Sequence, residues 1–226
     1  MEASTKQRLL EAGMAMLLEH GYNHLGIQQV LAATSVPKGS FYHHFKSKED
    51  FALQVIDQYM VAVHGGLDAC LGDLATAPLQ RVRRFFENTL ESYRQDGYLG
   101  CLLGGLGQEL SGINEVFRHR IERCFSEIAV RVASCLEEAI QRGELLPDTK
   151  APQLANLLVD CWEGAALRTR LLRDPAPLQA MLDFYFQSMM RSDQPSPPSR
   201  ERSKRRRPRP GSTRPAGGAR SNKRGR

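Results

Sequence analysis

A run of polar residues at positions 36–51, VPKGSFYHHFKSKEDF, carries side chains that could do chemistry. A lysine, a serine, a tyrosine and two histidines fall within two helical turns, and two further lysines follow them. Side chains of these types donate hydrogen bonds and carry positive charge, which is what contact with phosphates and base edges requires. A helix that only had to fold would not need so crowded a polar face.

The residues around this run predict two short helices joined by a tight corner. Apolar residues at helical spacing predict the first helix over about residues 27–33, and the corner follows at residues 34–36. Pro37 fits the first turn of the second helix, which is expected to run to about His44. Such a pair is a helix-turn-helix, whose second helix enters the DNA major groove. The alternative is that the polar residues form an ordinary solvated helix face.

Six residues are expected to contact DNA in this arrangement. Lys38 lies at the start of the second helix, where its charge adds to the free amide groups of the helix end against a phosphate. The others allow close backbone approach, contact base edges or donate to phosphates. They are Gly39, Ser40, Tyr42, His43 and Lys48. Phe41 and Phe45 are instead expected in the core, where they hold the helix in place.

A second candidate for chemistry is Cys101, in the segment GCLLGGLGQELS at residues 100–111. The thiolate is the reactive form of cysteine, and it is favoured by a nearby cation or a helix N-terminus. Because Cys101 follows Gly97 and Gly100 close to an expected helix start, we expect its pKa to be lowered, with help from Arg94 or another arginine. The alternative is that Cys101 is a small buried apolar residue.

The segment WEGAALRTR at residues 162–170 offers a place for a ligand. Arg168 or Arg170 can pair with a ligand carboxylate, with Trp162 as an apolar wall. The alternatives are that the arginines belong to a solvated face and that Trp162 packs in the core or between protomers.

The segments that must position these residues all have helical patterns, which predicts an all-α fold. A three-helix helix-turn-helix domain is expected over residues 1–50, and a helical ligand-binding and dimerisation domain over residues 51–193. Ser47 is expected to cap a long helix that reaches Leu71. Further helices are predicted at about 79–95, 98–111, 114–142, 150–172 and 175–191.

The last two predicted helices have apolar residues at helical spacing. These are Leu154, Leu157, Leu158, Cys161 and Ala165, followed by Leu178, Met181, Leu182, Tyr185 and Met189. They predict a buried apolar face on each helix, and the pattern does not exclude that this burial is within a single chain.

The charge divides sharply along the sequence. Residues 194–226 hold twelve Lys or Arg and one acid, whereas residues 1–193 hold nineteen bases and twenty-four acids. The composition of the tail, rich in Pro, Ser, Arg and Gly, predicts disorder. Its run KRRRPRPGSTRP at residues 204–215 can add nonspecific attraction to DNA or enter an AT-rich minor groove, or it can be a solvated extension of little consequence.

Several classes of protein are not expected. The chain has no apolar run of about eighteen residues and no signal-peptide pattern, so we expect no membrane span and a cytoplasmic location. Its five cysteines form no CxxC pair, which argues against a metal site. No phosphate loop, GxSxG or HExxH motif is found, so we expect no cofactor and no catalytic residues. The rival hypothesis is an enzyme or a thiol-based detoxifying protein that acts on small electrophiles.

Residues 5–51 resemble the DNA-binding domain of the tetracycline-repressor (TetR) family. The matching residues are Gly21-Tyr22, Ile27, Val30, the run Val36 to Phe45, and Lys46-Ser47-Lys48-Glu49. The resemblance implies a homodimer on a double-stranded DNA operator, with half-sites about 34–36 Å apart. It also implies a C-terminal ligand-binding domain and repression relieved by a small-molecule inducer. Gly26 departs from the family pattern, because many members have a capping Thr there that touches a phosphate.

GCLLGGLGQE and WEGAALRTR together resemble a subgroup that contains acrylate-responsive and N-ethylmaleimide-reductase repressors. In the latter, the cysteine of a Gly-Cys-Leu step, here Gly100-Cys101-Leu102, senses electrophiles. A lysine implicated there is matched by Arg170, so a lysine–cysteine switch does not carry over. The resemblance implies a repressor released by a small electrophile or an unsaturated acid.

Overall fold

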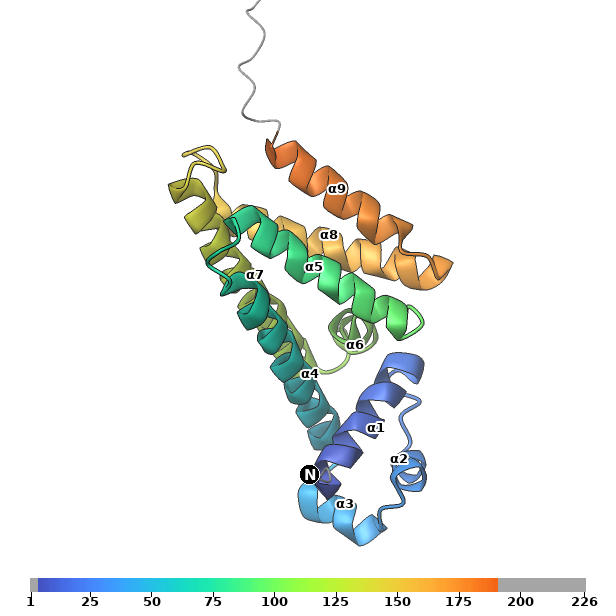
Figure 1. The fold of residues 1–226 in the computed structure, drawn as a ribbon. Coiled ribbons are helices and arrows are strands. Elements are labelled where there is room, and N and C mark those ends of the chain that lie inside the picture. Colours follow the sequence, from blue (N-terminus) through green and yellow to red (C-terminus); the bar gives the residue numbers. More distant parts are fainter. Residues whose placement is uncertain (1–3, 191–226) are drawn as a thin grey trace, which may run out of the picture. The chain divides into compact units, whose positions relative to one another are not determined.

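The structure, a computed structural model, describes residues 4–190, which form nine α-helices and no strand (Figure 1). In order they are α1 (Thr5–His20), α2 (Ile27–Thr34), α3 (Lys38–His44), α4 (Lys48–Leu71), α5 (Pro78–Gln95), α6 (Leu102–Leu110), α7 (Glu115–Gln141), α8 (Ala151–Leu172) and α9 (Ala176–Met190). The predicted all-α class is confirmed. No helix in this range is long and apolar enough to cross a membrane. The predicted basic tail lies outside the described residues.

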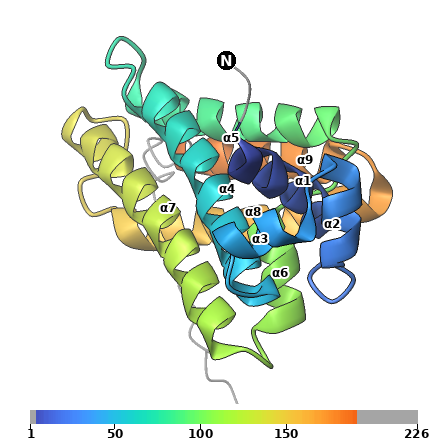
Figure 2. The ribbon, with the colours of Figure 1, turned by 90° about the horizontal axis from the view of Figure 1, so that it is seen from below.

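Helices α1, α2 and α3 are grouped beside the start of α4 (Figure 2). The Ser47 hydroxyl accepts a hydrogen bond from the Asp50 amide at 3.0 Å, which confirms the predicted cap of α4. Gly13 lets α1 approach α4 closely, because a Cβ at this position would lie 2.4 Å from the Phe51 ring. The three short helices are therefore fixed on the first turns of α4.

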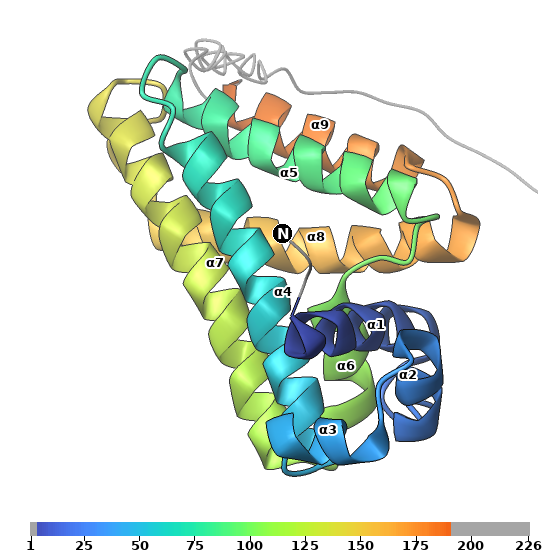
Figure 3. The same ribbon diagram turned by 60° about the horizontal axis from the view of Figure 1, so that its bottom comes forward.

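The long helices α4 and α7 lie side by side and run in the same direction (Figure 3). Ion pairs link them at a constant offset of 63 residues: Asp57 with Arg120, His64 with Glu127, and Asp68 with Arg131. At their starts, the Asn114 side chain donates to the Glu49 carboxylate at 2.8 Å. These pairs oppose sliding of one helix along the other.

The segment before α6 differs from the prediction of a helix starting at residue 98. Gly97, Tyr98 and Gly100 have φ values of 71°, 63° and 83°, in the left-handed region that an α-helix cannot use. Cys101 then precedes α6 as its N-cap residue. The chain makes a tight loop between α5 and α6 for this reason, and Cys101 lies where that loop ends.

Two clusters of buried residues stabilise the described chain. The first joins α1–α4 to α6 and to the beginning of α7, and the second joins α5, α8 and α9 to the remainder of α4 and α7. The partly buried side chain of Cys101 packs against both clusters. It therefore lies at the junction between the core under the helix-turn-helix and the core of the C-terminal helices.

The predicted apolar positions of α8 and α9 divide between two environments. Leu158, Leu178, Leu182 and Tyr185 are buried within this chain. Others face outward on the same helices, with Leu157 52% exposed and Cys161 also exposed. Met189 lies outside the residues whose side chains are described. Burial within one chain thus accounts for one face of each helix and leaves a second apolar face uncovered.

Candidate functional site

The outward edge of α3 carries the residues predicted to contact DNA. Lys38, Gly39, Tyr42 and His43 are exposed, and Ser40 is half-buried. The reason is helical geometry, because the intervening aromatic residues occupy the opposite face. Phe41 and Phe45 are 0% and 1% exposed, as expected for residues that anchor α3 to α1 and α4. The structure therefore brings five of the six predicted contacts onto one accessible edge.

Lys48, the sixth predicted contact, has a partner within the chain. Its ammonium nitrogen lies 4.5 Å from the centroid of the Tyr22 ring. Burial lowers the pKa of Lys48, while the charge of Glu109 acts in the opposite direction. A phosphate contact by Lys48 remains a prediction, and it would compete with this cation–π contact.

The turn between α1 and α2 is held from a distant helix. The Glu109 carboxylate accepts hydrogen bonds from the amides of Tyr22 and Asn23 at 2.7 and 2.6 Å. At Gly26, where no side chain can cap α2, the amide N–H donates to the side-chain oxygen of Gln29 at 3.3 Å. The position of α2, and with it α3, thus depends on a carboxylate near the end of α6.

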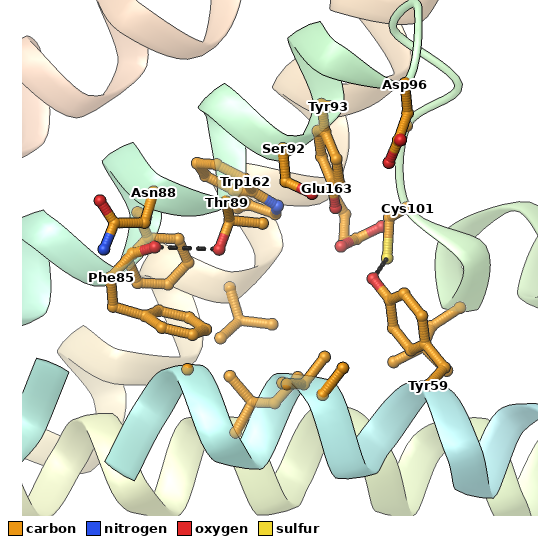
Figure 4. Close-up of a pocket in the computed structure, with 18 of the residues that line it drawn as sticks. Tyr59, Phe85, Asn88, Thr89, Ser92, Tyr93, Asp96, Cys101, Trp162 and Glu163 are labelled. Atoms are coloured by element: carbon orange, nitrogen blue, oxygen red, sulfur yellow. Dashed lines mark hydrogen bonds between the residues drawn. The ribbon is translucent and has the colours of Figure 1, made fainter. Parts of the chain in front are cut away.

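A cavity of about 310 Å³ lies among α4, α5, the α5–α6 loop and α8 (Figure 4). Most of its wall is aliphatic or aromatic, and its polar groups come from Tyr59, Asn88, Thr89, Ser92, Tyr93, Asp96, Cys101 and Glu163 (Figure 4). No Lys or Arg is among its lining residues. A volume of this size lies at the lower end of the range of small-molecule sites.

Cys101 lies in the wall of this cavity. Its sulfur is 3.9 Å from the Tyr59 hydroxyl oxygen (Figure 4). Burial raises the pKa of Cys101 strongly, and the charge of Glu163 adds to that effect. The prediction of a lowered pKa is therefore wrong. A hydrogen bond from the Gly104 amide, at the start of α6, does lower the pKa as expected, but it is outweighed by burial.

Trp162 packs in the core, which was one of the alternatives considered for it, and its contact with a ligand stays a prediction. Its ring centroid lies 4.9 Å from that of Phe86 and 5.9 Å from that of Tyr93, within the second buried cluster, which joins α5, α8 and α9 to α4 and α7. It also lines the cavity. Trp162 is thus a core residue whose ring forms part of the cavity wall.

Neither of the predicted ligand-pairing arginines lines this cavity. Arg170 donates to the carbonyl oxygens of Leu18 and Glu19, at 3.2 and 3.5 Å, where α1 ends. It also lines a smaller neighbouring pocket of about 270 Å³ that includes Cys101. Arg168 is exposed. The suggestion that Arg94 assists Cys101 is not supported, since its guanidinium lies 3.7 Å from the carboxylate of Glu91 on its own helix.

Glu163 was missed as a candidate from the sequence. Burial raises its pKa to about 7, and a hydrogen bond with Cys101 holds this rise back. Its carboxylate packs over Gly104, where a Cβ would lie 2.1 Å from one oxygen. A signal was present in the sequence, because Glu163 follows Val159 by four residues and therefore falls next to the buried face of α8.

Comparison with known proteins matches the two parts of the chain to two family models. Residues 9–55 match the bacterial regulatory proteins of the tetR family, and residues 78–185 match the tetracyclin repressor-like C-terminal domain. The first match contains the helix-turn-helix, and the second contains most of the cavity wall.

Individual relatives agree along most of the chain. The HTH-type transcriptional repressor DhaR of Mycobacterium sp. strain GP1 is 34% identical over 83% of this chain and 93% of its own length. The transcriptional regulator AcuR of Cereibacter sphaeroides is 38% identical over 77% of this chain and 80% of its own. The crystal structure of reduced E. coli NemR superimposes with a TM-score of 0.73 at 27% identity, over 82% of this chain and 97% of the other.

Proposed function

The chain belongs to the tetR family of bacterial regulatory proteins and is a DNA-binding transcriptional repressor, and we propose that a small electrophile releases it from DNA by reacting at Cys101. The proposed inducer is an α,β-unsaturated carbonyl compound. In this proposal residues 1–50 bind the operator and residues 51–193 bind the inducer and the second chain.

The observation that carries this proposal is the position of Cys101. Its sulfur is the nucleophile in the wall of a small apolar cavity, and it precedes α6 by one residue. An adduct would add atoms to a side chain that packs against both buried clusters. Because packed cores resist added volume, the strain is expected to move α6.

Movement of α6 would be transmitted to the DNA-binding edge of α3 through a few contacts. α6 begins beside Cys101 and, one residue before its end, carries the carboxylate that holds the α1–α2 turn. Arg170 provides a second link, from α8 to the end of α1. A shift at these contacts would reorient α3, and two recognition helices that lose their spacing cannot occupy successive major grooves together.

The second chain is proposed to cover the outer face of α8 and α9. Leu157 and Phe184 are 52% and 75% exposed, and Cys161 is exposed with them. Outward-facing leucine and phenylalanine side chains on adjacent helices are typical of a protein–protein interface. A symmetric dimer places two copies of α3 on one side, as a palindromic operator requires.

The test is a gel shift with a duplex selected for binding from a random-sequence pool. N-ethylmaleimide is expected to release the wild-type chain and to leave Cys101→Ser bound at the same dose. Cys161→Ser is the control for the proposed α8–α9 interface, because Cys161 is exposed on that face and lies outside the cavity wall. It should respond as the wild type does, which would exclude modification of that interface as the cause of release. Release of Cys101→Ser at the wild-type dose would reject the proposal.

A noncovalent acid is the second candidate inducer, favoured by the smaller pocket that Cys101 shares with Arg170. Acrylate would pair there with the guanidinium and pull Arg170 from the carbonyls of α1. Release by acrylate that persists in Cys101→Ser and is lost in Arg170→Ala would favour this candidate. Continued consumption of either compound in excess of the five cysteines of the chain would instead favour the rival hypothesis of an enzyme.

A further inference from the structure

Glu163 is a carboxylate on the inner side of α8 with no ion pair among the residues that the structure describes. It lies in the wall of the cavity directly after Trp162, and its side chain is only partly exposed. A buried carboxylate without a cation is costly to keep charged, which is why its pKa rises to about 7. Such a group exchanges protons near neutral pH.

The nucleophile beside the Glu163 carboxylate is the Cys101 sulfur. Figure 4 shows the Glu163 carboxylate turned toward Cys101, whose sulfur is also 3.9 Å from the Tyr59 hydroxyl oxygen. The Cys101 thiol and the Glu163 carboxylate both line the cavity, and each of the two groups shifts the pKa of the other. The thiol thus has a proton acceptor on one side and a phenol that can donate to a substrate oxygen on the other.

The remaining polar groups around Glu163 come from every element packed against it. α4 supplies Tyr59, α5 and the residue after it supply Tyr93 and Asp96, and α8 itself supplies Asp160 and Arg170. α6 supplies Gln108, and α7 supplies Arg118 and Glu122 along an outer groove that also reaches Glu163. The cations in this set line the neighbouring pockets and not the cavity.

Resting on the proposed function, we propose that Glu163 is the general base that accepts the Cys101 proton as the sulfur adds to a neutral unsaturated carbonyl inducer. The sulfur forms a bond to the β-carbon, the alkene π bond opens toward the carbonyl, and the S–H proton passes to the Glu163 carboxylate. The α-carbon of the resulting enolate then takes that proton, which restores the carboxylate. The product is a thioether, and no oxidant or reductant is needed.

This role explains how a thiol with a raised pKa can react at neutral pH. The thiolate is almost absent there, so a reaction that depends on free thiolate is slow. A base beside the sulfur removes the proton during the addition itself. The same base sets the class of inducer, because Glu163 and Asp96 disfavour an anion in a cavity without Lys or Arg.

The experiment measures the rate of Cys101 modification by N-ethylmaleimide on the full chain, using intact mass and peptide mapping at several pH values. For the wild type the rate should rise as the pH passes through about 7 and then level off, because the carboxylate form is the active one. Glu163→Gln should react about a hundredfold more slowly at neutral pH. Its rate should rise throughout the range, following the thiolate fraction.

Glu137→Gln is the matched control, since Glu137 is an exposed acid on α7 that lines none of the pockets around Glu163, and it should keep the wild-type rate and profile. Glu163→Asp should recover part of the rate, since it restores a carboxylate. A Glu163→Gln chain that binds the DNA duplex and reacts at the wild-type rate would overturn the inference, as would a wild-type rate with no plateau. If Cys101 reacts as described but DNA stays bound, the base assignment stands and the proposed function fails.

Discussion

Lys38 is an exposed side chain on α3, and we propose that it contributes to DNA binding. It is the first residue of α3, and it is exposed beside Tyr42 and His43 on the outward edge. A lysine at a helix start adds a full charge to the partial positive charge of the helix end. Its interaction with a phosphate does not depend on base sequence, so its loss should weaken binding to all duplexes alike.

Lys38→Ala should therefore lower the affinity for the selected duplex by about tenfold. It should also reduce the slope of log affinity against log salt concentration by about 1 for each chain bound, because one phosphate contact per chain is lost. Fluorescence anisotropy at several salt concentrations measures both quantities. Lys150→Ala, at the start of α8, is the control and should change neither. An unchanged slope in Lys38→Ala would exclude Lys38 as a phosphate contact.

Single residues also mark the limit of what the sequence can predict. The core positions of Phe41 and Phe45 follow from their spacing alone, since residues i and i+4 of a helix lie on the same face. The pKa of Cys101 does not, because burial depends on side chains from α4, α5 and α8 that are distant in sequence. The local effect that was predicted, from the amide of Gly104, exists and is simply the smaller one.

Among the helices, α6 links the cavity directly to the helix-turn-helix. Cys101 precedes it, and Glu109 near its end accepts from the amides of Tyr22 and Asn23. Both bonds to a charged acceptor are short, which makes this contact a strong link between the cavity and the helix-turn-helix. An allosteric signal needs such a physical connection, with a coupling free energy of about 1–3 kcal/mol in typical cases.

Glu109→Ala should uncouple the modification of Cys101 from the release of DNA. Cys101 in this variant should react with N-ethylmaleimide at the wild-type rate, yet the modified chain should keep more of its DNA affinity than the modified wild type. The comparison requires the anisotropy of fully modified samples of each protein. Glu137→Ala, an exposed acid on α7, is the control and should lose DNA as the wild type does. Equal loss of affinity in both variants would show that Glu109 does not transmit the signal.

The helices themselves were predicted well, and the loop between α5 and α6 was not. Ser47 and Leu71 bound α4 as expected, because a capping serine is a strong local signal. The α6 start was placed too early, at residue 98, because Tyr98 takes a positive φ that a tyrosine rarely adopts. The amides of Gly97 and Tyr98 donate to the carbonyls of Arg94 and Tyr93 at the end of α5, and the loop is what places Cys101 in the cavity wall.

In the proposed dimer, the second chain covers a surface that a single chain leaves exposed. Phe184 is 75% exposed, and Leu157 on the preceding helix is 52% exposed. Sequence periodicity predicted apolar faces on α8 and α9, but it could not separate residues such as Leu158, buried within the chain, from those that face outward. The buried and the outward-facing residues lie on the same two helices. The packing of α5 and α7 against these helices determines which residues are buried.

Native mass spectrometry of the chain on its selected duplex, before and after N-ethylmaleimide, tests dimerisation, DNA binding and release together. Before treatment we expect two chains per operator duplex. After treatment we expect free duplex and protein dimers in which peptide mapping finds the adduct on Cys101 of each chain. A single chain on the duplex would contradict the dimer, and duplex still held by chains fully modified at Cys101 would contradict release by an electrophile.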